Sequence, residues 1–178
     1  MDLFETWNWD EALSHLIYLA VAYGLALPIG WNREREERSA GLRTFPLVSM
    51  AACGFVMIAI EVLGITSEGQ ARIMEGLMTG IGFIGGGAIL KQGDRARGTA
   101  TAASLWATGA VGAAVGYGQL DIAVILSLVT FLTLIVMTPL RKVAQEGAEG
   151  DVEDGPSTSG AQGAGRMAKA GAEGAGQG

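Results

Sequence analysis

The side chains that could do chemistry are few, and they lie near the ends of apolar segments. Arg72 and Glu75 stand three residues apart where an apolar run begins, so they share one face of a helix. Such a pair can be satisfied locally at a membrane interface. A charge inside a membrane span is costly, however, and often serves a proton or a cation. We therefore expect either a plain interfacial pair or a cation site at Glu75. His15, the single histidine, is typical of an interfacial helix residue.

The residue types also argue against an enzyme. The chain has one histidine and one cysteine, Cys53, and it has no clustered carboxylates. No nucleophile with an adjacent base, and no soft-metal cluster, can be assembled from these residues. A hard cation such as Mg²⁺ would need oxygen ligands, some of which the carbonyls of glycine-rich helices could supply. We predict no enzymatic activity, no cofactor and no bound metal. The net charge of -6, without a basic block, argues against nucleic acid.

Glycines dominate the segment that follows Glu75. Gly80-Ile-Gly-Phe-Ile-Gly85 matches the dinucleotide pattern G-x-G-x-x-G, but it lies inside an apolar run, and residues 100–104 hold no carboxylate. A glycine costs about 1 kcal/mol in a helix interior, so six after Glu75 suggest close contact instead of helix propensity. In lipid, bare glycine surfaces let helix backbones touch.

A second small-residue face follows in the next apolar segment, where positions 104, 108, 112 and 116 recur every four residues. We predict that this face packs on the glycine-rich segment, and an alternative is that the two line a substrate site. The predicted helix-packing seam consists of Gly76, Gly80, Gly82, Gly85, Gly86, Ser104, Thr108, Gly112 and Gly116.

The elements that carry these residues are predicted to be transmembrane helices. Of the 178 residues 49% are hydrophobic and 17% charged, and the apolar ones fall in blocks of about 20, long enough to cross a bilayer. The acidic stretch 1–11 lacks the positive start of a signal peptide, so the first block is predicted to be a retained span. The five predicted spans are Ala12–Trp31, Leu42–Leu63, Ile73–Leu90, Thr99–Tyr117 and Ile122–Leu140.

Loop charges set the predicted orientation. Nine of the ten loop Lys and Arg residues lie on alternate loops, and Arg72 is the exception. By the positive-inside rule, the N-terminus is outside and the C-terminus is cytoplasmic. Four or six spans would break this asymmetry. The fold class is therefore all-α, with a short extracytoplasmic segment (1–11) and a five-helix membrane domain (12–143). The Gly/Ala-rich tail (144–178) cannot bury a core and is predicted to be disordered in the cytoplasm.

The second span is predicted to begin in the segment Ala40-Gly-Leu-Arg-Thr-Phe-Pro46. Pro46 is tolerated in a first helical turn, and Thr44 could cap the helix. Arg43 would then lie at the cytoplasmic interface, where it could reach lipid phosphate or bridge loops.

These segments together resemble the MgtC/SapB family of bacterial inner-membrane proteins. Order and spacing agree from Gly24 to about Leu140, and the combination is specific although no single piece is. The residues that carry the resemblance are Ile29-Gly30 with Arg33, Ala40-Gly-Leu-Arg-Thr44, Arg72-Ile, Gly80 to Gly87, Arg97-Gly-Thr99-Ala-Thr-Ala-Ala103, Trp106 and Gly116-x-Gly118.

The resemblance implies a five-helix membrane domain linked to Mg²⁺ limitation, acid tolerance and, in some pathogens, survival inside host cells. Some members look like regulators of membrane energetics through the ATP synthase. Three departures stand out here: Asn32 where the family often has an acidic residue, Ala107 where some members have cysteine, and a low-complexity tail in place of a folded C-terminal domain. The departure at Ala107 favours the SapB-like branch.

Two functional hypotheses follow. The first is a non-enzymatic inner-membrane regulator in magnesium-linked homeostasis or stress adaptation, which binds a membrane partner or itself. The second is a small cation transporter or channel for Mg²⁺, with Glu75 at one mouth. The candidate polar residues are Arg43, Thr44, Arg72, Glu75, Arg97 and Thr99.

Overall fold

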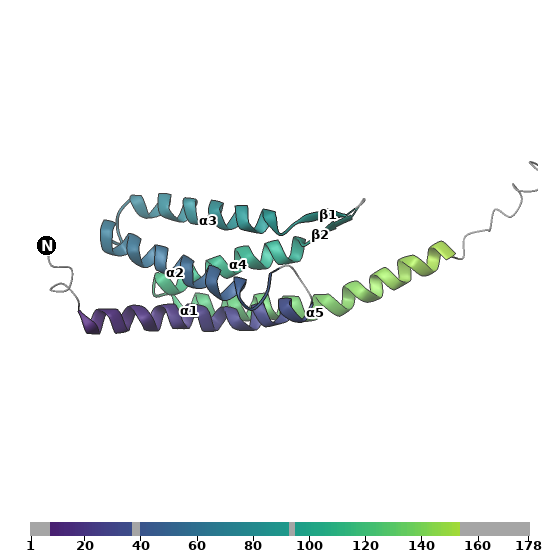
Figure 1. The fold of residues 1–178 in the computed structure, drawn as a ribbon, viewed down its shortest axis with the longest axis horizontal. Coiled ribbons are helices and arrows are strands. Elements are labelled where there is room, and N and C mark those ends of the chain that lie inside the picture. Colours follow the sequence, from purple (N-terminus) through teal and green to yellow (C-terminus); the bar gives the residue numbers. More distant parts are fainter. Residues whose placement is uncertain (1–7, 37–39, 93–94, 154–178) are drawn as a thin grey trace, which may run out of the picture. The chain divides into compact units, whose positions relative to one another are not determined.

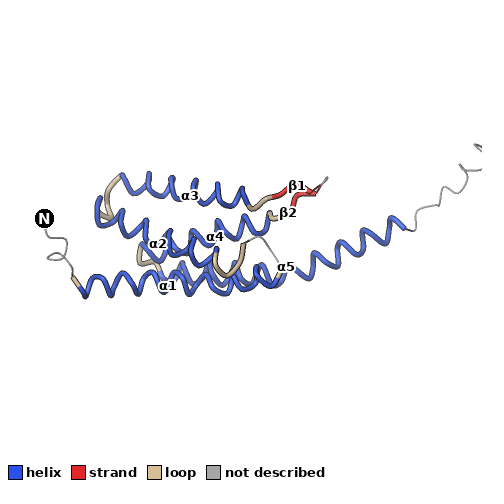
Figure 2. The backbone as a smooth tube through the Cα atoms, in the orientation of Figure 1, coloured by secondary structure: helices blue, strands red, loops and turns tan. Residues whose placement is uncertain are grey.

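The computed structural model describes residues 8–36, 40–92 and 95–153, with side chains through residue 137. Within these ranges the chain forms five helices and one short antiparallel hairpin (Figures 1 and 2). The described chain is thus mostly helical, as predicted, and the hairpin, whose strands follow the third helix directly, is an addition that was not predicted. The elements are α1 (Trp9–Arg35), α2 (Thr44–Leu63), α3 (Gly69–Gly87), β1 (Leu90–Gln92), β2 (Arg95–Arg97), α4 (Thr99–Gly116) and α5 (Leu120–Glu153).

Length and apolarity make three of these helices able to cross a membrane, counting only the described part of the chain: α1, α2 and the Leu120–Met137 part of α5. The other two helices are less apolar: α3 carries Gln70, Arg72 and Glu75 in its first two turns besides its glycines, and α4 is rich in glycine, alanine and hydroxyl residues. The helix α4 does not need an apolar surface, because most of it is buried against other helices.

Local signals explain where α1 and α2 begin. The side chain of Asn8 caps α1 by accepting a hydrogen bond from the Asp10 amide at 3.1 Å. No side chain caps α2, which begins at Thr44 itself, so the predicted Thr44 cap is wrong. The Thr44 amide instead donates to the Gly41 carbonyl at 3.0 Å, within a tight turn. Pro46 lies in the first turn, as predicted.

The helix α4 lies in the middle of the bundle and contacts α1, α2 and α3. Ten of its 18 residues are buried, among them Leu105, Val111 and Val115. Figure 1 shows α3 along the opposite side of α2 and α4 from α1. A hydrogen bond of 2.6 Å from the Ser127 hydroxyl to the Leu25 carbonyl ties α5 to α1.

The hairpin depends on one glycine. Gly98, between β2 and α4, has a φ of +91°, which side-chain-bearing residues rarely adopt. A Cβ at this position would also overlap the carbonyl oxygen of Ala88 at the end of α3. The turn that returns the chain from α3 to α4 therefore requires glycine on two independent grounds.

The chain divides into two compact units, Met1–Met137 and Thr138–Gly178. In the second unit, α5 continues to Glu153, so the prediction of a disordered tail is wrong for residues 144–153. Alanine, glutamine and glutamate in this stretch favour a helix and outweigh its two glycines. Residues 154–178 of the predicted tail lie outside the described residues.

Candidate functional site

The outward face of α3 is open. A Cβ built on Gly76, Gly80, Gly82 or Gly86 would meet nothing within 4 Å. The ring of Phe83, on the same side, is 84% exposed. The prediction that these four glycines pack against span four is therefore wrong within this chain. Their backbone faces outward, and no described residue of the chain covers it.

The inward face of α3 rests on α4 at two close points. Gly85 packs against the Ala102 carbonyl, with its virtual Cβ 3.2 Å from the oxygen. This contact agrees with the predicted seam. One turn back, the Ile81 side chain fills a notch at Gly109, a residue that sequence reasoning did not single out. A glycine of one helix that faces a long side chain of the next is the pattern that could have identified Gly109.

The small-residue face of α4 is buried as predicted, but against a different helix. A Cβ on Gly112 would overlap the Ser49 carbonyl oxygen, and one on Gly116 would lie 2.8 Å from Val56 Cβ, so both glycines pack on α2. Ser104 and Thr108 are also buried. Their hydroxyls donate to α4's own carbonyls, to Thr101 at 3.0 Å and to Ser104 at 2.7 Å. The predicted pairing of this face with α3 is thus corrected: its partner is α2.

The charged residues predicted near the start of α3 are on the surface. Both Arg72 and Glu75 are exposed, and in the part of the chain that the structure describes no ion pair joins them. The expected local pairing is therefore not formed. The Glu75 backbone carbonyl accepts a hydrogen bond of 2.8 Å from the Thr79 hydroxyl, which keeps that side chain close to the helix.

Sequence reasoning missed a buried amide that joins three elements. The Gln70 side chain donates hydrogen bonds of 3.0 Å to the carbonyls of Ala59 and Gly64. It accepts one, also of 3.0 Å, from the Tyr117 hydroxyl at the end of α4. Every polar atom of the amide group thus has a partner, which fixes the start of α3 against α2 and α4.

The basic residues predicted as functional gather at the opposite end, where the hairpin lies. Arg43 and Arg97 are exposed, and Thr99 is the exposed first residue of α4. Arg33, in contrast, is only 3% exposed and donates a hydrogen bond of 2.8 Å to the Asn32 side chain. The neutral amide of Asn32, noted above as a departure from the family pattern, therefore contacts a buried cation.

The turn between α1 and α2 packs on the end of α1. A Cβ on Gly30 would come within 3.3 Å of the Gly41 carbonyl oxygen, and the Glu34 carboxylate accepts a hydrogen bond of 3.1 Å from the Leu42 amide. Two glycines and one carboxylate thus hold the turn that carries Arg43. No group of three or more His, Cys, Asp or Glu residues that could hold a metal occurs among the described residues.

Comparison with known proteins finds one matching family and several bacterial relatives. The family model described as "MgtC family" matches residues 19–143. Protein SrpB of Synechococcus elongatus is 36% identical, over 74% of this chain and 78% of its own length. No solved structure matches the chain significantly.

Two further relatives have names that refer to MgtC or to magnesium. Protein MgtC of Brucella abortus is 37% identical over 77% of this chain and 57% of its own length. The "Putative magnesium transporter YhiD" of Escherichia coli K12 is 35% identical over 73% of this chain and 62% of its own length. The chain therefore spans less than two thirds of the length of these two relatives.

Proposed function

Because the chain belongs to the MgtC family, we propose that it is a multipass inner-membrane protein that acts as a non-enzymatic regulator in magnesium-linked homeostasis. In this proposal all five helices cross the membrane, with the N-terminus outside and the C-terminus in the cytoplasm. The distribution of Lys and Arg supports this orientation. The protein would act by binding a membrane partner.

The observation that carries the proposal is the open glycine face of α3. The outward surfaces of α1 and α5 carry long apolar side chains such as Leu16 and Leu128, which suit lipid. The outward surface of α3 instead presents Gly76, Gly80, Gly82 and Gly86. Each glycine weakens the helix by about 1 kcal/mol relative to alanine, and no contact from the residues that the structure describes offsets the loss. A partner helix packed backbone to backbone would supply that contact.

The kind of partner follows from the shape of this face. Gly76 and Gly80, like Gly82 and Gly86, are spaced by four residues and leave the backbone open to another transmembrane helix. We call this open surface the groove of α3, and the exposed Phe83 projects from the same side. The membrane part of the ATP synthase is the first partner to test, because the family resemblance points to it. A second copy of this chain is the other.

The test fills the groove of α3 with side chains and leaves the packing inside the bundle unchanged. Gly82→Leu with Gly86→Leu fills the groove, and both positions have free space within the chain. We expect the double variant to fold normally but to lose partner capture and to impair growth in low Mg²⁺. Gly24→Leu, on α1 with equal free space, is the matched control. Unchanged oligomeric state, partner capture and growth in the double variant would remove the groove from the proposal.

The name of one relative, "Putative magnesium transporter YhiD", favours a second candidate, a small transporter or channel for Mg²⁺. Here Glu75 would lie at one mouth of the path. Mg²⁺ flux into proteoliposomes tests this candidate. Empty vesicles are one control, and Glu68→Gln, which removes an exposed carboxylate seven residues before Glu75, is the other. Saturable flux that Glu75→Gln reduces would establish the transporter. No flux above empty vesicles, from protein shown to be folded, would leave the regulator.

A further inference from the structure

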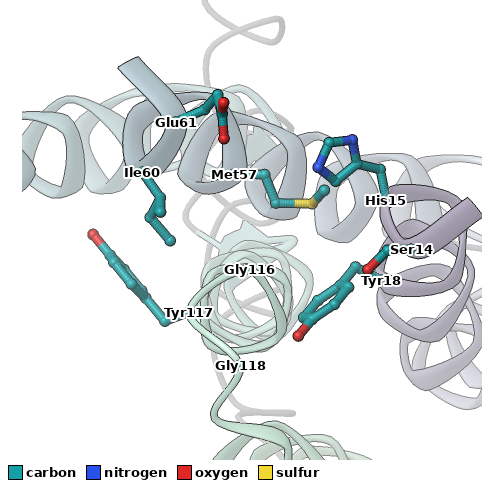
Figure 3. Close-up of a pocket in the computed structure, with 9 residues that line it drawn as sticks. All are labelled: Ser14, His15, Tyr18, Met57, Ile60, Glu61, Gly116, Tyr117 and Gly118. Atoms are coloured by element: carbon teal, nitrogen blue, oxygen red, sulfur yellow. The ribbon is translucent and has the colours of Figure 1, made fainter. Parts of the chain in front are cut away.

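A cavity with no assigned role opens at the end of the bundle where α1 begins. It measures about 290 Å³ and lies between the second turn of α1, the last turn of α2 and the end of α4 (Figure 3). Small-ligand pockets in proteins begin at about 300 Å³, so this one suits a ligand of a few heavy atoms. It lies outside the groove of α3, and what it binds is independent of the proposed function.

The walls combine one carboxylate with hydroxyl, aromatic and apolar groups. Figure 3 shows these side chains arranged around Gly116, with Glu61 from α2 on one side and Tyr18 from α1 on the other. No Lys or Arg is among the lining residues, which are Ser14, His15, Tyr18, Met57, Ile60, Glu61, Gly116, Tyr117 and Gly118.

The electrostatics of this lining favour a cation. Glu61 supplies a formal negative charge. The cavity also adjoins the C-terminal ends of α2 and α4, which are the negative ends of their helix dipoles, and the amides of Gly64 and Tyr117 cap the carbonyls of Ile60 and Ala113 there. On the α1 side, Asp10 and Glu11 in the first turn offset the positive end of that helix dipole, and His15 is the lining residue that can carry a positive charge.

The cavity is also held in shape. The Tyr117 hydroxyl donates to buried Gln70, so its ring is fixed as one wall. The floor at Gly116 lies directly on the Val56 side chain and the Cys53 carbonyl, with a virtual Cβ 2.8 and 2.9 Å from them. A preformed pocket of this kind binds without the cost of ordering its walls.

The other lining residues decide whether the pocket suits a metal ion or an organic cation. A bare divalent cation takes oxygen ligands, usually with one or two carboxylates, and this pocket has one carboxylate beside Met57 and Ile60. Apolar and aromatic walls around a single carboxylate suit an ammonium group carried on a short carbon chain, since its charge meets Glu61 and its CH groups meet the rings. We propose that this pocket binds a primary ammonium group, supplied either by a free amine or by the ethanolamine headgroup of a phospholipid.

The test follows the thermal midpoint of the full chain in nanodiscs. In discs of phosphatidylglycerol, ethanolamine hydrochloride should raise the midpoint above that seen with NaCl at equal ionic strength. Glu61→Gln should weaken the apparent affinity about tenfold or more, as expected for loss of a charged partner. Glu68→Gln, an exposed carboxylate outside the pocket, should not. A midpoint raised only by phosphatidylethanolamine in the disc, and dependent on Glu61, would support the proposal and assign the lipid as the source.

Two further variants keep the proposal testable if the Glu61→Gln variant does not fold. Ser14→Trp fills the mouth and keeps every charge, so it should also abolish the shift. Tyr18→Phe keeps the ring and should retain it, whereas Tyr18→Leu should not. The proposal is overturned if neither amine source moves the wild-type midpoint, or if the shift survives both Glu61→Gln and Ser14→Trp. An equal Glu61-dependent shift with MgCl₂ would overturn the choice of an ammonium over a metal ion.

Discussion

Gly80 and Gly112 each belong to a run of small residues spaced by four, but their surroundings are opposite. Gly112 is covered by the Ser49 backbone, whereas Gly80 has empty space around it. We expect Gly112→Ala to lower the free energy of unfolding by about 1–3 kcal/mol, because its methyl group would overlap a carbonyl oxygen. Gly80→Ala should raise it by up to about 1 kcal/mol through helix propensity. Unfolding of the detergent-solubilised monomer measures both. Equal effects would contradict the assigned packing.

The buried amide of Gln70 gives a second prediction. Tyr117→Phe removes the hydroxyl that donates to Gln70 and leaves the amide oxygen buried without that donor. We expect a loss of about 1–3 kcal/mol in the free energy of unfolding. Tyr23→Phe removes a hydroxyl from a 39% exposed tyrosine on α1 and is the matched control. A loss no greater than that of Tyr23→Phe would show that the hydrogen bond does not stabilise the fold.

Sequence periodicity identified the small faces of α3 and α4, but of the predicted α3 glycines only Gly85 packs on α4, and Gly112 and Gly116 pack on α2. A spacing of four shows which residues share a face, and it does not show which helix covers that face. Ser49, Cys53 and Val56 on α2 form the complementary surface, and they are spread over a span that reads as uniformly apolar. Gln70 was missed for a different reason: a lone glutamine at a predicted span end looks solvated until Tyr117 and Gly64 are brought beside it.

The attachment of α3 gives a prediction at the scale of elements. On the inward face of α3, Ile81 fits against Gly109 of α4, and Gly85 packs against Ala102 of α4. Gly109→Leu would fill the notch that Ile81 occupies and should loosen α3 while α1 and α2 stay packed. Hydrogen exchange of the α3 amides in nanodiscs should then rise about tenfold or more, as a local opening. Gly24→Leu should leave it unchanged, and unchanged exchange in Gly109→Leu would argue against this contact.

The span count is a property of the whole molecule, and single-helix apolarity does not decide it. The described chain has three helices that qualify as spans one by one. The apolar blocks of the sequence predict five spans, and the loop charges fit an odd number. A helix such as α4, with ten of its 18 residues buried, needs little apolar surface. The helix α3 is the harder case, because its open glycine face meets lipid poorly unless a partner covers it. The hairpin could not be foreseen, since three-residue strands carry too little pattern.

Labelling of single cysteines separates five spans from three. In a Cys53→Ala background, Glu68→Cys reports on the α2–α3 turn and Lys91→Cys on the hairpin, and both positions are exposed. With five spans and the N-terminus outside, a membrane-impermeant maleimide should label Glu68→Cys in intact spheroplasts. It should label Lys91→Cys only after permeabilisation.

If α3 and α4 do not cross, the hairpin stays on the same side as the α2–α3 turn, and both cysteines react from outside. That outcome would place the basic hairpin against the charge rule, and it would expose the glycine face of α3 to water instead of to a membrane partner. The proposed regulator would then lose its binding surface. Labelling of Lys91→Cys therefore tests the topology and the proposed partner groove in one measurement.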